Sequence, residues 1–111
     1  MLEFTDNHVG RAIVVALKGK VDNLSADLFD AHCRQLLSDG EQSFVFDCTE
    51  LAYLSSAGLR VILKLAQTIA PKGKIAFAAM NESVKEIFAV SGFGEMFRSY
   101  PTLEGAIQEG L

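Results

Sequence analysis

Two adjacent serines, Ser55 and Ser56, are the residues whose types and position best suit chemistry. They directly precede residues 57–70, where apolar residues recur every three or four positions and predict an amphipathic helix. Either serine could cap this helix, because a hydroxyl there accepts a hydrogen bond from a free backbone N–H group. The positive end of the helix dipole would also stabilise a phosphate attached to either hydroxyl.

The predicted helix has an apolar face and a polar face. Its expected buried positions are Leu59, Ile62, Leu63, Ala66 and Ile69. The expected solvent-facing positions are Arg60, Lys64, Gln67 and Thr68. Ser56, Arg60 and Lys64 are spaced one turn apart on this exposed face. Two simpler interpretations stay open: a serine that only caps the helix, and two basic residues that are only solvated.

Composition limits the function classes. The 111 residues are 50% hydrophobic and carry ten basic and fourteen acidic side chains, which gives a net charge of -4. We therefore expect a single domain over residues 1–111, without the basic patch of a nucleic-acid surface. No apolar run approaches the roughly 20 residues of a membrane span, and no signal peptide is evident, which favours a cytoplasmic protein.

The two cysteines, Cys33 and Cys48, have neither the spacing nor the histidine neighbours of a zinc site. We expect reduced thiols in or near the core. The sequence implies no metal and no organic cofactor, and it does not determine the oligomeric state.

Hydrophobic patterning predicts an α/β fold with a mixed sheet of four to five strands and about four helices, packed mainly on one face. The expected strands are 2–8, 12–18, 43–48, 74–79 and 96–100, and the expected helices run from Asn23 or Ser25 to Leu37, then over 57–70, 82–90 and 102–108. The apolar side of the first helix is expected to include Leu28, Phe29, Leu36 and Leu37. Strands 43–48 and 74–79 should be parallel, which places the serines at a carboxyl edge of the sheet.

Several short motifs then carry a family resemblance. They are Gly19-x-x-Asp22, a strand ending in Asp47, the loop Tyr53-Leu54-Ser55-Ser56-Ala57-Gly58-Leu59, and Ser91-Gly92-Phe93. From about Ile13 to Ile107 the chain resembles an anti-sigma factor antagonist of the STAS fold. The serine loop followed by Gly-Leu is the most specific of these motifs.

The resemblance implies a partner switch. Members bind an anti-sigma factor with serine kinase activity and thereby free a sigma factor. The kinase phosphorylates a loop serine, which breaks the complex, and a serine phosphatase restores it. Matching the family's Gly-Leu to Gly58-Leu59 places the phosphoacceptor at Ser56, with Ser55 as the alternative. The implied partner-binding residues are Asp22, Asn23, Ser55, Ser56, Ala57, Gly58 and Arg60.

The chain departs from the family pattern at two positions. Many members have an aspartate where this chain has Ser55, and a small residue where it has Arg60. The arginine lies four residues after Ser56, the spacing at which helical side chains meet. We therefore hypothesise that Arg60 pairs with phosphorylated Ser56 and stabilises that form.

Other interpretations compete with the switch. A nucleophilic serine would need a histidine base, but the chain lacks a Gly-x-Ser-x-Gly elbow and neither His8 nor His32 is obviously placed, so we expect no enzyme. STAS-like domains also serve as non-enzymatic subunits of lipid-transport ATPases or as signalling-complex adaptors. Asp22 could simply be a turn residue, and Asp47 could hold the serine loop through backbone N–H groups.

Overall fold

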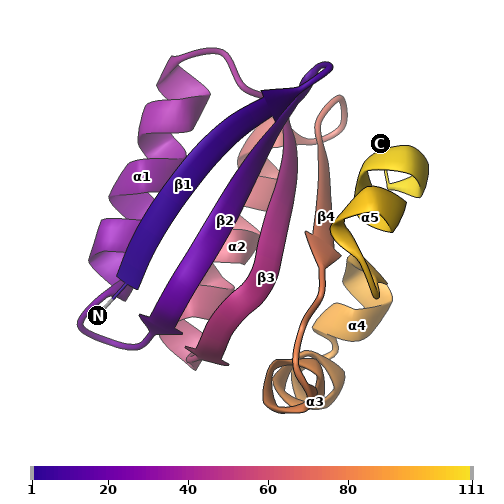
Figure 1. The fold of residues 1–111 in the computed structure, drawn as a ribbon. Coiled ribbons are helices and arrows are strands. Elements are labelled where there is room, and N and C mark those ends of the chain that lie inside the picture. Colours follow the sequence, from indigo (N-terminus) through magenta and orange to yellow (C-terminus); the bar gives the residue numbers. More distant parts are fainter. Residues whose placement is uncertain (1, 111) are drawn as a thin grey trace.

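The computed structural model describes residues 2–110, which form one five-stranded sheet with five helices (Figure 1). The strands are β1 (Leu2–Val9), β2 (Ala12–Val21), β3 (Ser43–Leu54), β4 (Lys74–Ala78) and β5 (Arg98–Tyr100). The helices are α1 (Ala26–Ser38), α2 (Ser56–Ile69), α3 (Glu82–Ser91), α4 (Phe93–Met96) and α5 (Leu103–Glu109). The strand order is β1-β2-β3-β4-β5, with β1 antiparallel to β2 and the other pairs parallel. The predicted mixed α/β sheet is confirmed.

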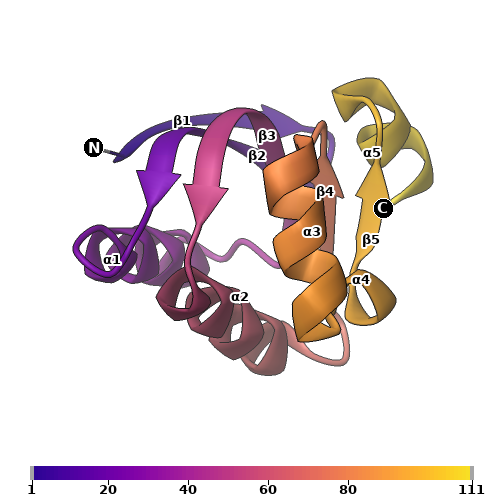
Figure 2. The same ribbon diagram turned by 90° about the horizontal axis from the view of Figure 1, so that it is seen from below.

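The two faces of the sheet are covered unequally. Helices α1, α2 and α3 contribute to the larger core, whose centre is a chain of aromatic contacts through Phe29, Phe46, Phe77 and Phe88. Helix α5 covers the opposite face, where small residues such as Ala76, Ala78 and Ala106 form a thinner core. Figure 2 shows α1 and α2 on one side of the sheet and α5 on the other. The prediction that the helices pack mainly on one face is confirmed.

Strand β3 is six residues longer than the predicted 43–48 and reaches Leu54. Its pairing with β2 shifts register twice, between Ala16 and Lys18 and again between Gly19 and Lys20. Such bulges place extra residues on one strand and break the two-residue alternation of side chains. In this half of β3 the buried residues are therefore Cys48, Leu51 and Leu54, three apart. The predicted serine loop is wrong in extent, because only Ser55 separates the strand from the helix.

The helix faces differ from prediction at a few positions. In α1, Leu28 is 52% exposed instead of buried. In α2, Val61 and Leu65 are buried, whereas the predicted core residues Leu63 and Ala66 are only half-buried. Helix α2 packs against α1 as well as against the sheet, which turns its buried face toward Val61 and Leu65.

Most predicted helix ends are confirmed. The Asn81 side chain accepts a hydrogen bond from the Val84 N–H at 2.9 Å, and the Thr102 hydroxyl accepts one from the Gly105 N–H at 3.0 Å. Gly92 ends α3 with a left-handed φ of 83°, which favours glycine. The short helix α4 was not predicted; it begins with Phe93, which is buried in the larger core.

Both cysteines are buried and unpaired, as predicted. Burial raises the pKa of Cys33 and of Cys48 to about 12, so both remain protonated thiols at neutral pH. Between residues 2 and 110, no three His, Cys, Asp or Glu side chains are arranged to hold a metal ion. No helix in the same range has the length and apolar character needed to cross a bilayer.

Candidate functional site

The two adjacent serines occupy different environments. Ser55 is the N-cap of α2: its hydroxyl accepts a hydrogen bond from the Gly58 N–H at 3.2 Å, and only 7% of the residue is exposed. Ser56 is the first residue of α2 and is exposed to solvent. The cap is therefore Ser55, and the free hydroxyl at the positive end of the helix is Ser56.

Gly58 lets the start of α2 approach the sheet closely. A Cβ atom at this position would lie 2.6 Å from Leu54 Cδ1 and 2.7 Å from Val21 Cγ1. Only glycine fits without movement of these two core side chains. Close packing therefore explains the glycine of the Gly58-Leu59 pair. The same packing determines where Ser56 lies relative to the ends of β2 and β3.

A second polar turn, Asp22 to Ser25, lies between β2 and α1. The Asp22 carboxylate accepts hydrogen bonds from the Leu24 and Ser25 N–H groups at 3.0 and 2.9 Å. The Ser25 hydroxyl accepts from the Asp22 N–H at 2.9 Å and lies 2.8 Å from the Lys20 carbonyl oxygen. Ser25 therefore occupies the N-cap position without a side-chain cap bond. The N–H and hydroxyl groups of Ser25 lower the pKa of Asp22.

The structure brings this turn next to the serine junction. The Ser55 N–H donates to the Val21 carbonyl oxygen at 2.7 Å, so the residues that follow β2 adjoin the start of α2. Asn23 is exposed, and the next residue, Leu24, is 92% exposed. All seven predicted partner-binding residues lie on these two connected segments; Asp22 and Ala57 are half-buried, and Ser55 and Gly58 are buried.

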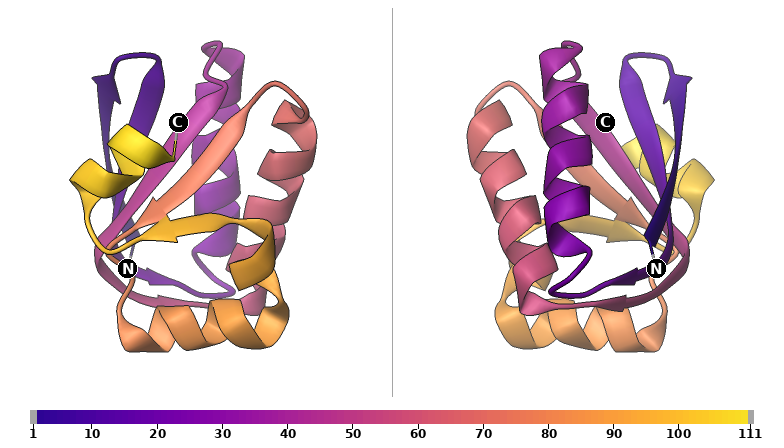
Figure 3. Two further views of the ribbon diagram at one scale, coloured as in Figure 1. Left: turned by 90° about the vertical axis from the view of Figure 1, so that its right-hand side faces the viewer. Right: turned by 90° about the vertical axis from the view of Figure 1, so that its left-hand side faces the viewer.

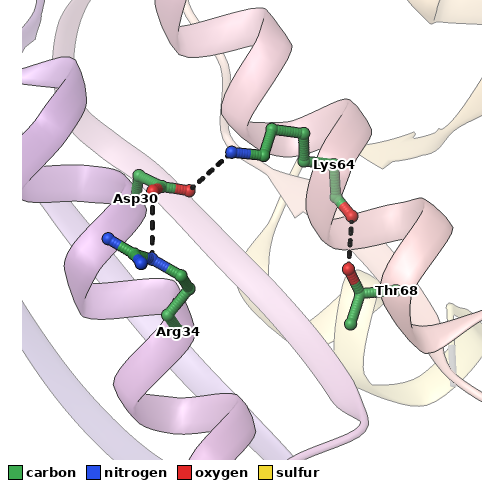
Figure 4. A network of polar contacts seen from close by, with 4 residues as sticks. All are labelled: Asp30, Arg34, Lys64 and Thr68. Carbon is green, nitrogen blue, oxygen red and sulfur yellow. Dashed lines mark hydrogen bonds and ion pairs between the residues drawn. The ribbon is translucent and has the colours of Figure 1, made fainter.

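The basic residues of α2 are not equivalent. Lys64 reaches across to α1, where its ammonium lies 3.8 Å from an oxygen of Asp30, and the other oxygen of Asp30 contacts Arg34 at 3.1 Å (Figure 4). Within residues 2–110, Arg60 makes no ion pair. Of the two cations that share a helix face with Ser56, Arg60 is therefore the one available to a new negative charge.

A groove that the sequence did not predict begins at Ser56. It has a volume of about 630 Å³ and lies between the end of β3, the first turn of α2 and helix α3. The apolar part of its lining is Tyr53, Leu54, Leu59, Ile87 and Val90. Figure 3 shows α3 lying across the end of the sheet, with α2 rising beside it. Val90, which is 83% exposed, marks this surface most clearly. The sequence alone does not show which apolar residues are exposed.

The remaining polar candidates do not approach the serines. His8 contacts Glu41, and His32 lies 2.8 Å from Asp6, so each histidine joins the β1–β2 hairpin to another segment. The Asp47 carboxylate accepts hydrogen bonds from the N–H and hydroxyl of Thr49, inside β3. The expectation that Asp47 could hold the serine loop is wrong, because β3 continues for seven more residues beyond it.

Comparison with known proteins identifies the fold and its relatives. The STAS domain model matches residues 3–106. The chain belongs to the STAS-domain family. This STAS domain is 30% identical over 97 residues to a Bordetella bronchiseptica protein named as an anti-sigma factor antagonist, BtrV, covering 86% of this chain and 84% of that protein.

Solved structures agree with this assignment. An anti-sigma factor antagonist from Mycobacterium paratuberculosis superposes with a TM-score of 0.91 at 18% identity, over 99% of this STAS domain and 94% of that chain. The Bacillus antagonist SpoIIAA in its unphosphorylated form gives a TM-score of 0.81 at 22% identity, over 96% and 94%. SpoIIAA has also been solved in a phosphorylated form, with a TM-score of 0.72 at 21% identity, over 96% and 97%.

Proposed function

We propose that this STAS domain is an anti-sigma factor antagonist whose binding is controlled by phosphorylation of Ser56. In its unmodified form it binds an anti-sigma factor that is also a serine kinase, and so releases a sigma factor. Phosphorylation ends the interaction, and a serine phosphatase restores it. The proposed role requires the cytoplasm, where sigma factors act.

One observation carries the assignment of the acceptor. Ser56 presents an exposed hydroxyl on the first residue of α2, whereas the Ser55 hydroxyl is buried and occupied by the Gly58 N–H. A kinase must reach the oxygen that it modifies, and modification of Ser55 would break the cap of the helix. The relatives named as anti-sigma factor antagonists support the choice of partner class.

The chemistry of the switch is a phosphoryl transfer. The Ser56 hydroxyl oxygen forms a bond to the γ-phosphorus of ATP, the bond from that phosphorus to the bridging oxygen breaks, and ADP leaves. The hydroxyl proton passes to a base of the kinase. In the reverse step, the phosphatase uses water to cleave the phosphate ester, releasing inorganic phosphate and regenerating the hydroxyl. The STAS domain itself supplies only the acceptor.

Local electrostatics account for the loss of binding. A phosphate group adds a charge of about -1.5 to -2 and several acceptor oxygens where a hydroxyl was. A partner that packs closely against the start of α2 would have to desolvate this group. The proposed partner surface comprises the exposed parts of the Asp22–Asn23 turn and of the segment from Ser55 to Arg60, two regions that are joined through Val21.

The test is phosphorylation by serine-kinase anti-sigma factors of the same genome, with ATP, followed by site mapping with tandem mass spectrometry. We expect phosphate on Ser56, and none in the Ser56→Ala variant. Ser55→Ala is the matched control, because it removes the neighbouring hydroxyl and leaves the proposed acceptor. Phosphorylated and unmodified protein are then compared for binding to the same kinase, and we expect only the unmodified form to bind tightly.

Phosphate found on Ser55 would keep the function and refute the residue assignment. If kinases that modify their own known substrates neither bind nor phosphorylate this protein, the proposed function is wrong. Copurification with a membrane transport ATPase would then favour the transport-subunit interpretation.

A further inference from the structure

We propose that the groove between α2 and α3 receives an apolar segment of the anti-sigma factor that carries a basic residue. This inference rests on the proposed function and extends the partner surface beyond the residues that the sequence indicates. The groove has a volume of about 630 Å³, and Ser56 is one of its lining residues. The surface around the acceptor hydroxyl therefore continues directly onto α3.

The lining favours an apolar partner. Leu54 and Leu59 are buried at the base of the groove, Ile87 is half-buried, and Tyr53 and Val90 are 44% and 83% exposed. Apolar side chains that gather around one groove, unlike single exposed ones, are typical of surfaces that a partner covers. The apolar residues come from β3, α2 and α3, so the groove fits a segment that lies along a helix face.

The charge of the groove specifies the partner further. Glu86 is the single charged residue among those that line the groove. In the chain from residue 2 to residue 110 it makes no ion pair, whereas the neighbouring Glu82 lies 3.6 Å from Lys85. A lysine or arginine on the partner, placed among apolar side chains, would complement this carboxylate.

This geometry also explains why a phosphate at Ser56 acts on binding. The phosphate would share the groove with the carboxylate of Glu86, beside apolar side chains that the partner covers. One basic residue of the partner neutralises the carboxylate of Glu86, whereas the phosphate adds nearly two further negative charges at the same surface. Repulsion and desolvation then oppose binding, without any movement of the fold.

The experiment measures the dissociation constant of the unphosphorylated protein for the anti-sigma factor kinase that modifies it. ADP replaces ATP, so that no phosphate is transferred during the titration. We expect Val90→Glu to weaken binding about tenfold or more, and Glu86→Lys to weaken it severalfold. Met96→Glu is the matched control, because Met96 is 57% exposed on α4 outside the groove, and it should bind within about twofold of the unaltered protein.

Three results would overturn the proposal. If the unaltered protein and Val90→Glu bind equally, the groove is not part of the interface, although the proposed function stands. If no kinase binds the unaltered protein, the proposed function and the groove assignment both fail. If sedimentation shows a dimer that Val90→Glu converts to a monomer, the groove is occupied by a second copy of this chain. Equal circular dichroism spectra of all variants would establish that each is folded.

Discussion

The turn between β2 and α1 and the junction between β3 and α2 lie side by side, and each starts a helix from the end of a parallel strand. They use their polar groups differently. In the first, the carboxylate of Asp22 and the hydroxyl of Ser25 are hydrogen-bonded within the turn itself. In the second, the Ser55 hydroxyl accepts from the Gly58 N–H, and the neighbouring Ser56 remains exposed.

Ser56 stays available for chemistry because neighbouring groups hold the start of α2 in place. Val21 links the two regions, because its carbonyl oxygen accepts from Ser55 and its side chain would meet a Cβ atom at Gly58. The hydrogen-bonded turn from Asp22 to Ser25 and the close packing of Gly58 against Val21 and Leu54 support the start of α2, and we call these residues the frame. Ser56 is not part of the frame. Mutations in the frame should therefore act mainly on stability, whereas mutations of Ser56 should act on function.

The largest effect is expected at Gly58. In Gly58→Ala, the new Cβ atom would clash with Leu54 and Val21, so either the core side chains or the start of α2 must shift. We expect a loss of about 1–3 kcal/mol in the free energy of unfolding, measured by urea denaturation. The expected loss comes from the clash of the added Cβ atom at this position, and not from the replacement of a glycine in general.

Gly94→Ala is the matched control for this prediction. A Cβ atom at Gly94 in α4 would meet no atom closer than 3.8 Å, so the added methyl group should not destabilise the fold. A Gly58→Ala variant as stable as Gly94→Ala would show that the start of α2 is not held tightly against the sheet.

The second prediction separates the two serines. Ser55→Ala removes the side-chain acceptor for the Gly58 N–H, and we expect it to reduce the free energy of unfolding by about 1 kcal/mol. Ser56→Ala removes an exposed hydroxyl, and we expect a change within about 0.5 kcal/mol. Thermal unfolding of both variants checks this order. Equal losses would contradict the assignment of Ser55 as the cap.

The third prediction concerns pH and the turn. The folded pKa of Asp22 lies below its ordinary value of 3.8, because the ionised carboxylate accepts the Ser25 hydrogen bonds. The stabilisation is therefore complete above the unfolded pKa, and it is lost as pH falls through the lower folded pKa. Asp22→Ala should be less stable than the unaltered protein at pH 7, and the gap should narrow below about pH 4.

Asp22→Asn distinguishes charge from geometry in this turn. Its amide oxygen still accepts hydrogen bonds, but it carries no charge, so its stability should lie between the other two proteins at pH 7. Chemical denaturation across the pH range provides the measurement. A stability gap for Asp22→Ala that does not change with pH would contradict the role of the ionised carboxylate.

The sequence predicted what local patterns determine. The cap at Asn81, the cap at Thr102 and the apolar side of α2 around Leu59 and Ile62 all follow from short-range chemistry. The second half of β3 did not, because its bulges depend on pairing with β2, and the resulting three-residue spacing resembles neither a regular strand nor a loop. Leu28 followed the apolar pattern of α1 but faces solvent.

The candidate site was predictable only in part. The sequence identified both serines, and the family resemblance placed the proposed acceptor at Ser56. Which of the two caps the helix could be decided only from the position of the helix start. The groove was missed because Val90 and Glu86 line it only when α3 packs against β3 near the start of α2, an arrangement that no spacing within α3 encodes.

The smallest expected effect concerns Arg60 and the second pKa of a phosphate on Ser56. Arg60 lies one turn after Ser56, whereas Lys64 is already placed against Asp30. An arginine near the phosphate favours its dianionic form and lowers its second pKa. In protein carrying phosphoserine at position 56, we expect Arg60→Gln to raise that pKa by about 0.2–0.7, since exposed ion pairs contribute roughly 0.2–1 kcal/mol. A phosphorus NMR titration measures this value directly.

Lys64→Gln is the matched control and should leave the second pKa of the phosphate unchanged. If Arg60→Gln also leaves this pKa unchanged, the arginine is only a solvated side chain, and the phosphate is stabilised by the start of α2 alone.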